Sequence, residues 1–257
     1  MPRSSRGTLL CGLLTASCFG SVLRAEGEAA ISDRFERAYS TWRRYIQSQG
    51  IGSSSDGPYI NNQPFQEIVA LGPQAVPLII AKASTDPGAH FLVHALSKIT
   101  RKVFSVEQRL RHGYGNQAQA ALWREWWRGG EAETEAVFRE GLEGWRQLRA
   151  RGDTMLWTDT ASLGPGYGIV RTKRELTDLG RAYMRMADLG IEALPLIVDA
   201  IANGQTDLAP LVEHITAGEA RLQGSITEAI KERCAEWWSR EAVRWQLPRR
   251  GVAAGNE

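Results

Sequence analysis

Hydrophobic positions along most of the chain recur at intervals of three and four residues, the period of an α-helix with one buried face. The first helix predicted in this way runs from Ser32, a residue type suited to capping a helix, to about Ser48. No stretch shows convincing alternation of apolar and polar residues at period two, so the pattern predicts an all-α protein. The further predicted helices cover residues 64–71, 75–84, 86–100, 117–128, 131–151, 172–189 and 225–245, with two more after Leu194 and Asp207.

One stretch of ten residues occurs twice. It reads Leu-Gly-Pro-Gln-Ala-Val-Pro-Leu-Ile-Ile at 71–80 and Leu-Gly-Ile-Glu-Ala-Leu-Pro-Leu-Ile-Val at 189–198, with six identical positions. Glycine tolerates the left-handed φ that ends a helix. Proline fits a first helical turn because the N–H groups there have no intrahelical partner. Each copy therefore predicts a helix end, a tight turn and the start of an apolar helix, which together make a helical hairpin.

This hairpin resembles the helix-turn-helix of HEAT repeats, in the variant common in secreted bacterial HEAT-like proteins. The resemblance covers residues 63–100 and 176–217, and it extends to the Trp-rich helices around Trp126-Trp127 and Trp237-Trp238. HEAT units repeat at about 40 residues, whereas the two copies here lie 118 residues apart. The repeating unit is therefore longer than one HEAT unit. The resemblance implies a HEAT-like α-solenoid that acts as a scaffold for partner binding.

The order of helices and long loops occurs twice, which predicts two tandem five-helix modules. The first module spans residues 32–130 and the second 131–247, followed by a disordered tail at 248–257. Stacking the modules would bury the apolar face that each leaves open. Capping boxes are predicted at Thr172-x-x-Glu175 and Ser225-x-x-Glu228. Because adjacent helical residues point about 100° apart, one Trp of each pair should enter the core.

The first 25 residues have the features of a secretory signal peptide. Arg3 and Arg6 give a positive start, a short apolar stretch follows over 8–19, and Ala25 offers a small residue for cleavage. The apolar stretch is short of the ~20 residues of a membrane-spanning helix, so no transmembrane segment is expected in the mature chain. The sequence therefore predicts a secreted or periplasmic protein. An N-terminal lipid on Cys18 is the alternative.

Removal of residues 1–25 changes the charge and the cysteine content. Three of the 31 basic residues and none of the 29 acidic ones lie there, which leaves 28 against 29 and a net charge of −1. This balance does not favour nucleic acid as a partner. Cys234 is then the one remaining cysteine, so no intrachain disulfide can form. Its position on a predicted helix is typical of a small buried hydrophobe.

The two long loops, 49–63 and 152–170, carry the candidate binding residues, because binding residues concentrate on loops held by rigid scaffolds. Exposed aromatic residues flanked by glycine suit contact with a peptide or a glycan. We expect the partner to be a protein or peptide of unknown identity. The residues predicted to contact it are Tyr59, Asp153, Trp157, Asp159 and Tyr167.

An enzymatic function is the alternative to a non-enzymatic scaffold. Asp153 and Asp159, or Asp56, could act as the acid and base of a glycosidase if the fold brought them into one cleft. His90 and His94 have the i, i+4 spacing of metal ligands, but no acidic residue accompanies them nearby and three or four ligands are needed. We therefore expect no metal and no cofactor. The Trp pairs could form a sugar platform, although their place on amphipathic helices favours packing.

Overall fold

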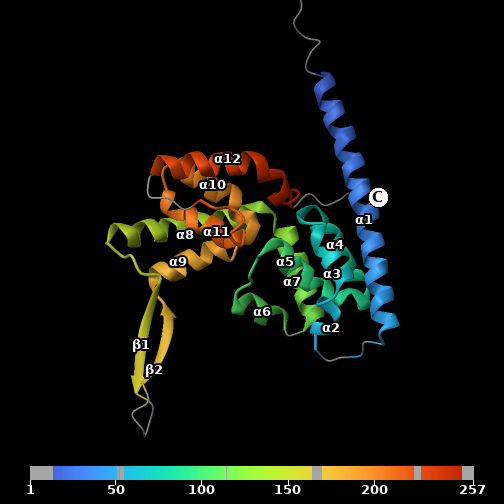
Figure 1. The fold of residues 1–257 in the computed structure, drawn as a ribbon, viewed down its shortest axis with the longest axis horizontal. Helices are drawn as coiled ribbons and strands as arrows, with labels where there is room; N and C mark the ends of the chain where they lie inside the picture. The colour runs from blue at the N-terminus through green and yellow to red at the C-terminus, as the bar shows by residue number, and fades with distance from the viewer. Residues whose placement is uncertain are drawn as a thin grey trace, which may run out of the picture. The chain divides into compact units, whose positions relative to one another are not determined.

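The computed structural model of the chain describes residues 14–50, 52, 55–113, 115–163, 170–222 and 227–250. The chain divides into two compact units, residues 1–71 and residues 72–257. Both are mostly helical, which confirms the predicted all-α class, and the described part of the second unit also contains a two-stranded sheet (Figure 1). The unit boundary falls inside the predicted first module, and the division into two modules stays a prediction.

The described part of the first unit contains α1 (Leu14–Ser48), α2 (Gly57–Ile60) and α3 (Gln63–Ala70). Trp42 on α1 is fully buried, and its Nε1 donates a hydrogen bond to the carbonyl of Tyr59 at 2.8 Å. The Trp42 ring lies 6.0 Å from that of Phe65 on α3. Asn62 caps α3 by accepting from the Phe65 N–H at 3.0 Å. Helix α1 continues without a break past the predicted cleavage position at Ala25.

The second unit begins with a series of short helices that follow the predicted order. These are η1 (Pro73–Ala75), α4 (Val76–Thr85), η2 (Pro87–Leu92), α5 (Val93–Thr100), α6 (Val106–His112) and α7 (Asn116–Gly129). Asp86 caps η2, because its side chain accepts a hydrogen bond from the Gly88 N–H at 2.8 Å. Helix α6 was not predicted. Its start carries a capping box formed by Ser105 and Gln108.

The rest of the second unit begins with α8 (Glu131–Ala150), which matches the helix predicted over 131–151. Strands β1 (Trp157–Leu163) and β2 (Val170–Leu176) follow, and then α9 (Asp178–Ala187) and η3 (Gly190–Ala193). The chain continues through α10 (Leu194–Ala202), η4 (Thr206–Leu208), α11 (Ala209–Ile215) and α12 (Thr227–Trp245). Ser225 of the second predicted capping box lies outside the described residues.

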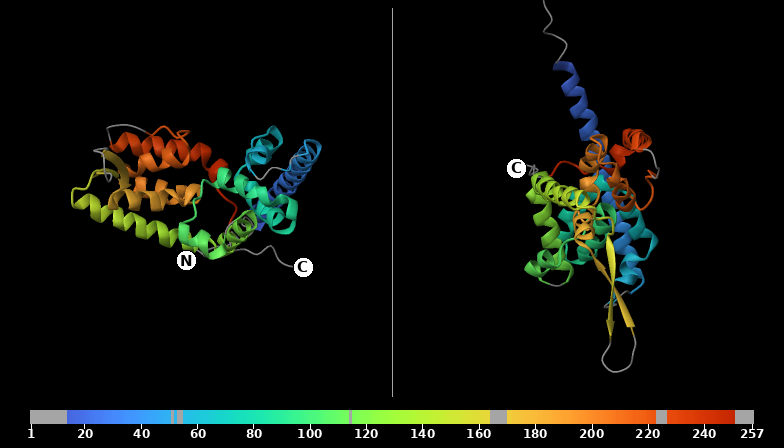
Figure 2. Two further views of the ribbon diagram at one scale, coloured as in Figure 1. Left: turned by 90° about the horizontal axis from the view of Figure 1, so that it is seen from below. Right: turned by 90° about the vertical axis from the view of Figure 1, so that its left-hand side faces the viewer.

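The strands correct two predictions. Residues 157–176 contain an antiparallel hairpin where a loop and the start of a helix were expected, with Trp157 opposite Leu176 and Leu163 opposite Val170. The predicted capping box at Thr172-x-x-Glu175 is therefore wrong, because Thr172 pairs with Ala161 inside β2. Helix α9 is capped instead by Thr177, whose side chain accepts from the Gly180 N–H at 3.0 Å. The hairpin extends away from the helices of its unit (Figure 1 and the right-hand view of Figure 2).

The two copies of the ten-residue motif have matching local structures. Gly72 and Gly190 have φ values of 73° and 69°. Gly72 precedes η1 and Gly190 is the first residue of η3, and each 3-10 turn leads into an apolar helix with proline at its start. Ile79 and Ile197 are both fully buried at equivalent positions. The copies differ in their surroundings. A Cβ at Gly72 would meet nothing within 4 Å, whereas one at Gly190 would lie 2.2 Å from the Thr100 carbonyl oxygen.

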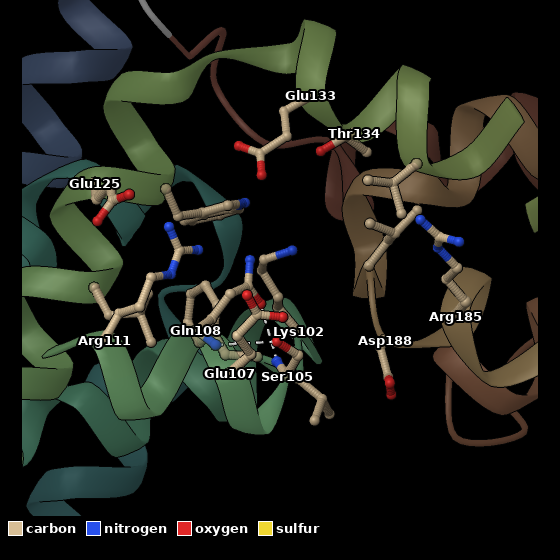
Figure 3. A pocket seen from close by; sticks show the side chains of 16 residues that line it. Lys102, Ser105, Glu107, Gln108, Arg111, Glu125, Glu133, Thr134, Arg185 and Asp188 are labelled. Carbon is tan, nitrogen blue, oxygen red and sulfur yellow. Dashed lines mark hydrogen bonds between the residues drawn. The ribbon is translucent and has the colours of Figure 1, made fainter. Parts of the chain in front are cut away.

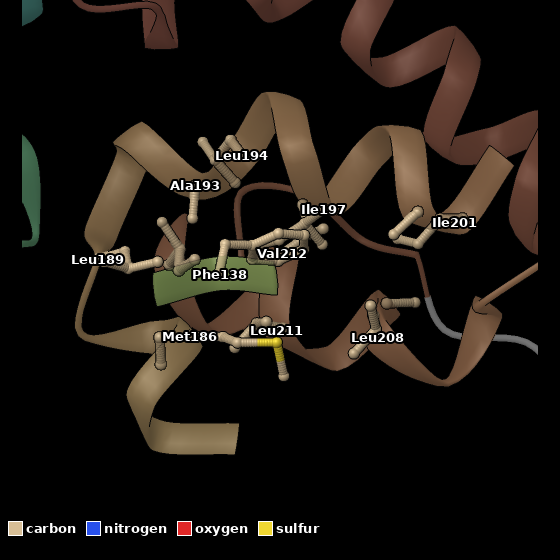
Figure 4. Close-up of a cluster of buried hydrophobic side chains, with 14 of the residues drawn as sticks. Phe138, Met186, Leu189, Ala193, Leu194, Ile197, Ile201, Leu208, Leu211 and Val212 are labelled. Atoms are coloured by element: carbon tan, nitrogen blue, oxygen red, sulfur yellow. The ribbon is translucent and has the colours of Figure 1, made fainter. Parts of the chain in front are cut away.

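The core of the second half of unit 2 is mostly aliphatic and lies where α8, α9, η3, α10, η4, α11 and α12 meet (Figure 4). Its five aromatic members are Phe138, Trp145, Tyr183, Trp237 and Trp245. Trp126 and Trp237 are buried, at 5% and 7% exposure, while Trp127 and Trp238 are half-buried. This agrees with one Trp of each pair entering the core. Among the described residues no single helix is both long and apolar enough to cross a membrane, and the consecutive helices Gln63–Ala70 and Pro73–Thr85 pass that test only as a pair.

Candidate functional site

The base of the β-hairpin is fixed to the start of α9. Thr177 Oγ1 donates to the Met155 carbonyl at 2.6 Å, and the Thr177 N–H donates to the Leu156 carbonyl at 3.1 Å. Gly180 lets the two segments approach this closely, since a Cβ there would lie 2.0 Å from the Leu156 carbonyl oxygen. Beside this fixed base, Met155 and Trp157 are 69% and 44% exposed. Two large apolar side chains are therefore held in solvent at the root of the hairpin.

The residues predicted from the long loops are distributed over both units. Trp157 is the first residue of β1, Asp159 lies two residues further on opposite Arg174, and Asp153 lies exposed in the approach to the strand. These three belong to the second unit, whereas Tyr59 belongs to the first, where it is half-buried on α2. Tyr167 falls outside the described residues. Asp153, Trp157 and Asp159 thus lie on one segment of the second unit, as their positions in the sequence require.

A second candidate site was not predicted. It is a cavity of about 330 Å³ inside unit 2, lined by the α5–α6 connection and by α6, α7, α8 and the end of α9. Figure 3 shows Lys102, Arg111 and Glu133 turned toward this shared space from different elements. The cavity has apolar walls as well, which include Leu122, Val137 and Leu189.

Lys102 is the most unusual group in the cavity, because it is a lysine with only 9% exposure. Its ammonium lies 5.4 Å from the ring centre of Phe104 and 5.7 Å from that of Trp126, within the range of cation–π attraction. No carboxylate oxygen of the described residues lies within 4.0 Å of the Lys102 ammonium nitrogen, so the ammonium forms no ion pair there. Burial lowers the pKa of Lys102, and the more distant Glu192 carboxylate partly opposes this effect.

The backbone around Lys102 is firmly held. The Lys102 N–H donates to Thr100 Oγ1 at 3.2 Å, and the Val103 N–H donates to the Asp188 carbonyl at 2.9 Å. Gly190 packs directly against this segment, since a Cβ at Gly190 would lie 2.7 Å from the backbone nitrogen of Lys102. The second copy of the repeated motif therefore positions the lysine.

A buried ion pair lies next to the cavity. Arg250 donates to the Glu192 carboxylate and to the carbonyls of Trp126 and Gly130, and to Thr134 Oγ1 at 3.1 Å. Glu192 also accepts from Trp126 Nε1 at 3.1 Å. Burial raises the pKa of Glu192 and lowers that of Arg250, and in each case the partner's charge opposes the shift. Residues 248–250, predicted as part of a disordered tail, end in this buried contact, and 251–257 lie outside the described residues.

Two other charged groups on the cavity wall already have partners. Arg185 donates to both carboxylate oxygens of Glu140 at 2.7 Å, and His112 Nε2 lies 2.5 Å from Glu125 Oε2. Burial raises the pKa of the Asp188 carboxyl, with the charge of Lys102 acting against it. Lys102 therefore differs from Arg185 and Arg250, because it is buried without a paired carboxylate among the described residues.

The described residues contain no group of three or more His, Cys, Asp or Glu side chains placed to hold a metal. His90 Nδ1 lies 2.7 Å from the Pro87 carbonyl oxygen, and the His90 ring contacts Phe91. Cys234 is 1% exposed, and burial raises the pKa of its thiol to about 11, which suits a packed side chain. The enzymatic alternative stays a prediction.

Comparisons of the chain with protein-family models, with curated proteins and with solved structures find no match.

Proposed function

We propose that the protein is a non-enzymatic helical-repeat scaffold that binds a protein or peptide partner after secretion or export to the periplasm. The repeat part of the proposal is supported by the matching local structures of the two motif copies. It is further supported by Thr100 and Thr216, which end equivalent helices and donate to the carbonyls of Leu96 and Val212 at 2.8 and 2.9 Å. A HEAT-like α-solenoid of two stacked modules would explain both features.

The observation that carries the binding function is the β-hairpin. A two-stranded hairpin is only marginally stable by itself in water, yet this one projects from the helices of its unit on a base fixed by Thr177 and Gly180. Within the described residues each strand pairs only with the other, and a free strand edge can accept an extended peptide. The exposed Met155 and Trp157 add the kind of apolar anchor that dominates binding energy at interfaces.

A photo-crosslinking experiment on the full chain tests this function. The crosslinking amino acid p-benzoylphenylalanine is placed at Trp157, and in a control variant at Val243, which is 80% exposed on α12. In envelope extract we expect a discrete adduct from position 157 and none from position 243. An excess of wild-type chain without the crosslinking amino acid should reduce the amount of adduct, whereas a chain carrying Trp157→Ala and Met155→Ala should not. Equal adducts from both positions, or equal competition by both chains, would contradict the proposal.

A further inference from the structure

We propose that the Lys102 cavity binds the C-terminal carboxylate of a peptide that ends in an apolar residue. This inference rests on the proposed partner-binding function and gives that function a peptide pocket separate from the hairpin. The cavity places one buried cation beside apolar walls, and a C-terminal residue is the peptide element that presents a carboxylate and an apolar side chain together.

The charge of Lys102 is the first step of the argument. Removing an ammonium from water is costly unless a paired carboxylate and hydrogen bonds compensate for it. Arg250 and Arg185 have carboxylate partners in the structure. Among the described residues no carboxylate forms an ion pair with the Lys102 ammonium, which lies over the rings of Phe104 and Trp126, while Glu192, Glu133 and Asp188 act on it from further away. A ligand carboxylate that reaches Lys102 would supply the missing partner.

The size and walls of the cavity are the second step. About 330 Å³ is at the lower end of the range for pockets that bind small ligands, which suits one amino-acid residue rather than a longer segment. Leu122, Val137 and Leu189 line the cavity and can contact an apolar side chain. The rim residue Val103 is 53% exposed, so the preceding residues of a bound peptide can leave the cavity toward solvent there.

The remaining charges define which anion fits. Arg111 lines the cavity and can donate to a peptide carbonyl. The acids that line it are the exposed Glu107, Glu125 and Glu133 and the half-buried Asp188. Like charges next to a ligand disfavour its binding. A group with a single negative charge is therefore accepted at Lys102, whereas a phosphate dianion or a run of acidic residues meets stronger repulsion from these four acids.

Calorimetric titration of the full chain tests the proposal with four probes. These are the tripeptide acetyl-Gly-Gly-Phe with a free carboxylate, the same peptide as its C-terminal amide, acetyl-phenylalanine, and benzyl phosphate. We expect the free acid to bind at least about tenfold more tightly than the amide, because the amide carries no negative charge to pair with the Lys102 ammonium. Acetyl-phenylalanine should bind more weakly than the tripeptide because it lacks the preceding peptide groups.

Variants assign the effect to the lysine. Lys102→Met should reduce binding of the free acid about tenfold or more, and Lys98→Met, a change to another lysine close by on α5, should leave it unchanged. Glu133→Gln should tighten binding about two- to threefold by removing a like charge. Thermal unfolding serves as the folding control, and Lys102→Met should unfold at no lower temperature than the wild type because it removes an unpaired buried charge.

Several outcomes would overturn the inference. Equal binding of the acid and the amide would mean that the carboxylate is not recognised, and tighter binding of benzyl phosphate would assign the cavity to a dianion. Equal binding of acetyl-phenylalanine and the tripeptide would assign it to a free acid instead of a peptide end. If no probe produced heat on titration, the cavity would not be a peptide-binding site. The crosslinking result at Trp157 would then still test the scaffold function independently.

Discussion

Replacing Arg250 by methionine removes a guanidinium whose side chain is 1% exposed and leaves the Glu192 carboxylate, with 7% exposure, without its counter-charge. The methionine side chain retains much of the aliphatic volume of arginine, so the change tests the charge and the hydrogen bonds rather than the packing. The carbonyls of Trp126 and Gly130 also lose a donor. Unit 2 should therefore become markedly less stable.

The magnitude follows from the burial of both partners. Breaking a buried ion pair by removing one member costs about 3–5 kcal/mol, because the other charge stays buried and uncompensated. For a unit of this size each kcal/mol corresponds to about 2–4 °C in Tm, so we expect a decrease of roughly 6–20 °C. Glu192→Gln retains an acceptor for Trp126 Nε1 but leaves Arg250 unpaired, and it should destabilise the protein as well. The double variant should recover about 2–3 kcal/mol relative to the sum of the two single changes.

The loss should also depend on pH. Burial raises the pKa of Glu192 in the folded protein. A group with a raised folded pKa contributes stability that is fully present below its unfolded pKa and is lost as the pH rises through the folded value. Without Arg250 this pKa should rise further, since an opposing positive charge has been removed. The difference in unfolding free energy between Arg250→Met and the wild type should therefore shrink as the pH is lowered through the raised pKa of Glu192.

Urea unfolding followed by circular dichroism, at neutral pH and at about pH 4.5, provides the measurement. The Arg240→Met variant is the matched control, because the Arg240 side chain is 66% exposed and pairs only loosely with Glu236 on α12. Its effect should stay below about 1 kcal/mol. A loss for Arg250→Met as small as that of the control would refute the reasoning. Strict additivity of the two single changes would show that Arg250 and Glu192 do not act as a pair.

Two further predictions concern backbone space and thiol burial. Gly190→Ala should destabilise the protein by roughly 2–5 kcal/mol, since the new Cβ meets the backbone of residues 100–102 in addition to the strain of a positive φ. Gly72→Ala should cost only the backbone strain, roughly 1–3 kcal/mol. If both variants lost the same unfolding free energy in denaturant, the contact of the new Cβ with residues 100–102 would be excluded as a cause. In a chain with Cys11 and Cys18 replaced by serine, Cys234 should react with a disulfide reagent at pH 8 only as fast as the protein unfolds, because its thiol is buried and its pKa is raised to about 11. Rapid labelling in the absence of urea would contradict this.

The helices were predictable because each buries one face. Ile79 and Ile197 follow the motif glycines at a helical period, and the structure buries both completely. The left-handed conformations at Gly72 and Gly190 also follow from the sequence, since glycine before a proline-bearing helix start indicates a tight turn. The spacing of apolar residues along a helix does not reveal that Gly190 packs against another segment, because its neighbour Thr100 lies 90 residues earlier in the chain.

The hairpin was missed because the period-two alternation in its first strand is interrupted by Asp159. Residues 157–163 read Trp-Thr-Asp-Thr-Ala-Ser-Leu and contain few apolar positions. The available signal was weaker and consisted of the Thr and Val residues on either side of a Gly- and Pro-rich stretch at 164–168. Helix α6 was also missed, because Val106 and Leu110 are exposed, although its Ser105-x-x-Gln108 capping box was visible in the sequence.

The Lys102 cavity could not have been found from any local pattern, and the repeated motif shows why. Gln74 and Glu192 occupy the same position in the two copies. Gln74 Nε2 donates to the Gln246 carbonyl at 3.2 Å, and Glu192 accepts from Arg250. Both copies therefore use this position to hold the segment that follows α12, and the second copy also places Gly190 against the backbone of Lys102. Since a tertiary contact sets the environment of the lysine, the repeated sequence could predict the turn but not the site beside it.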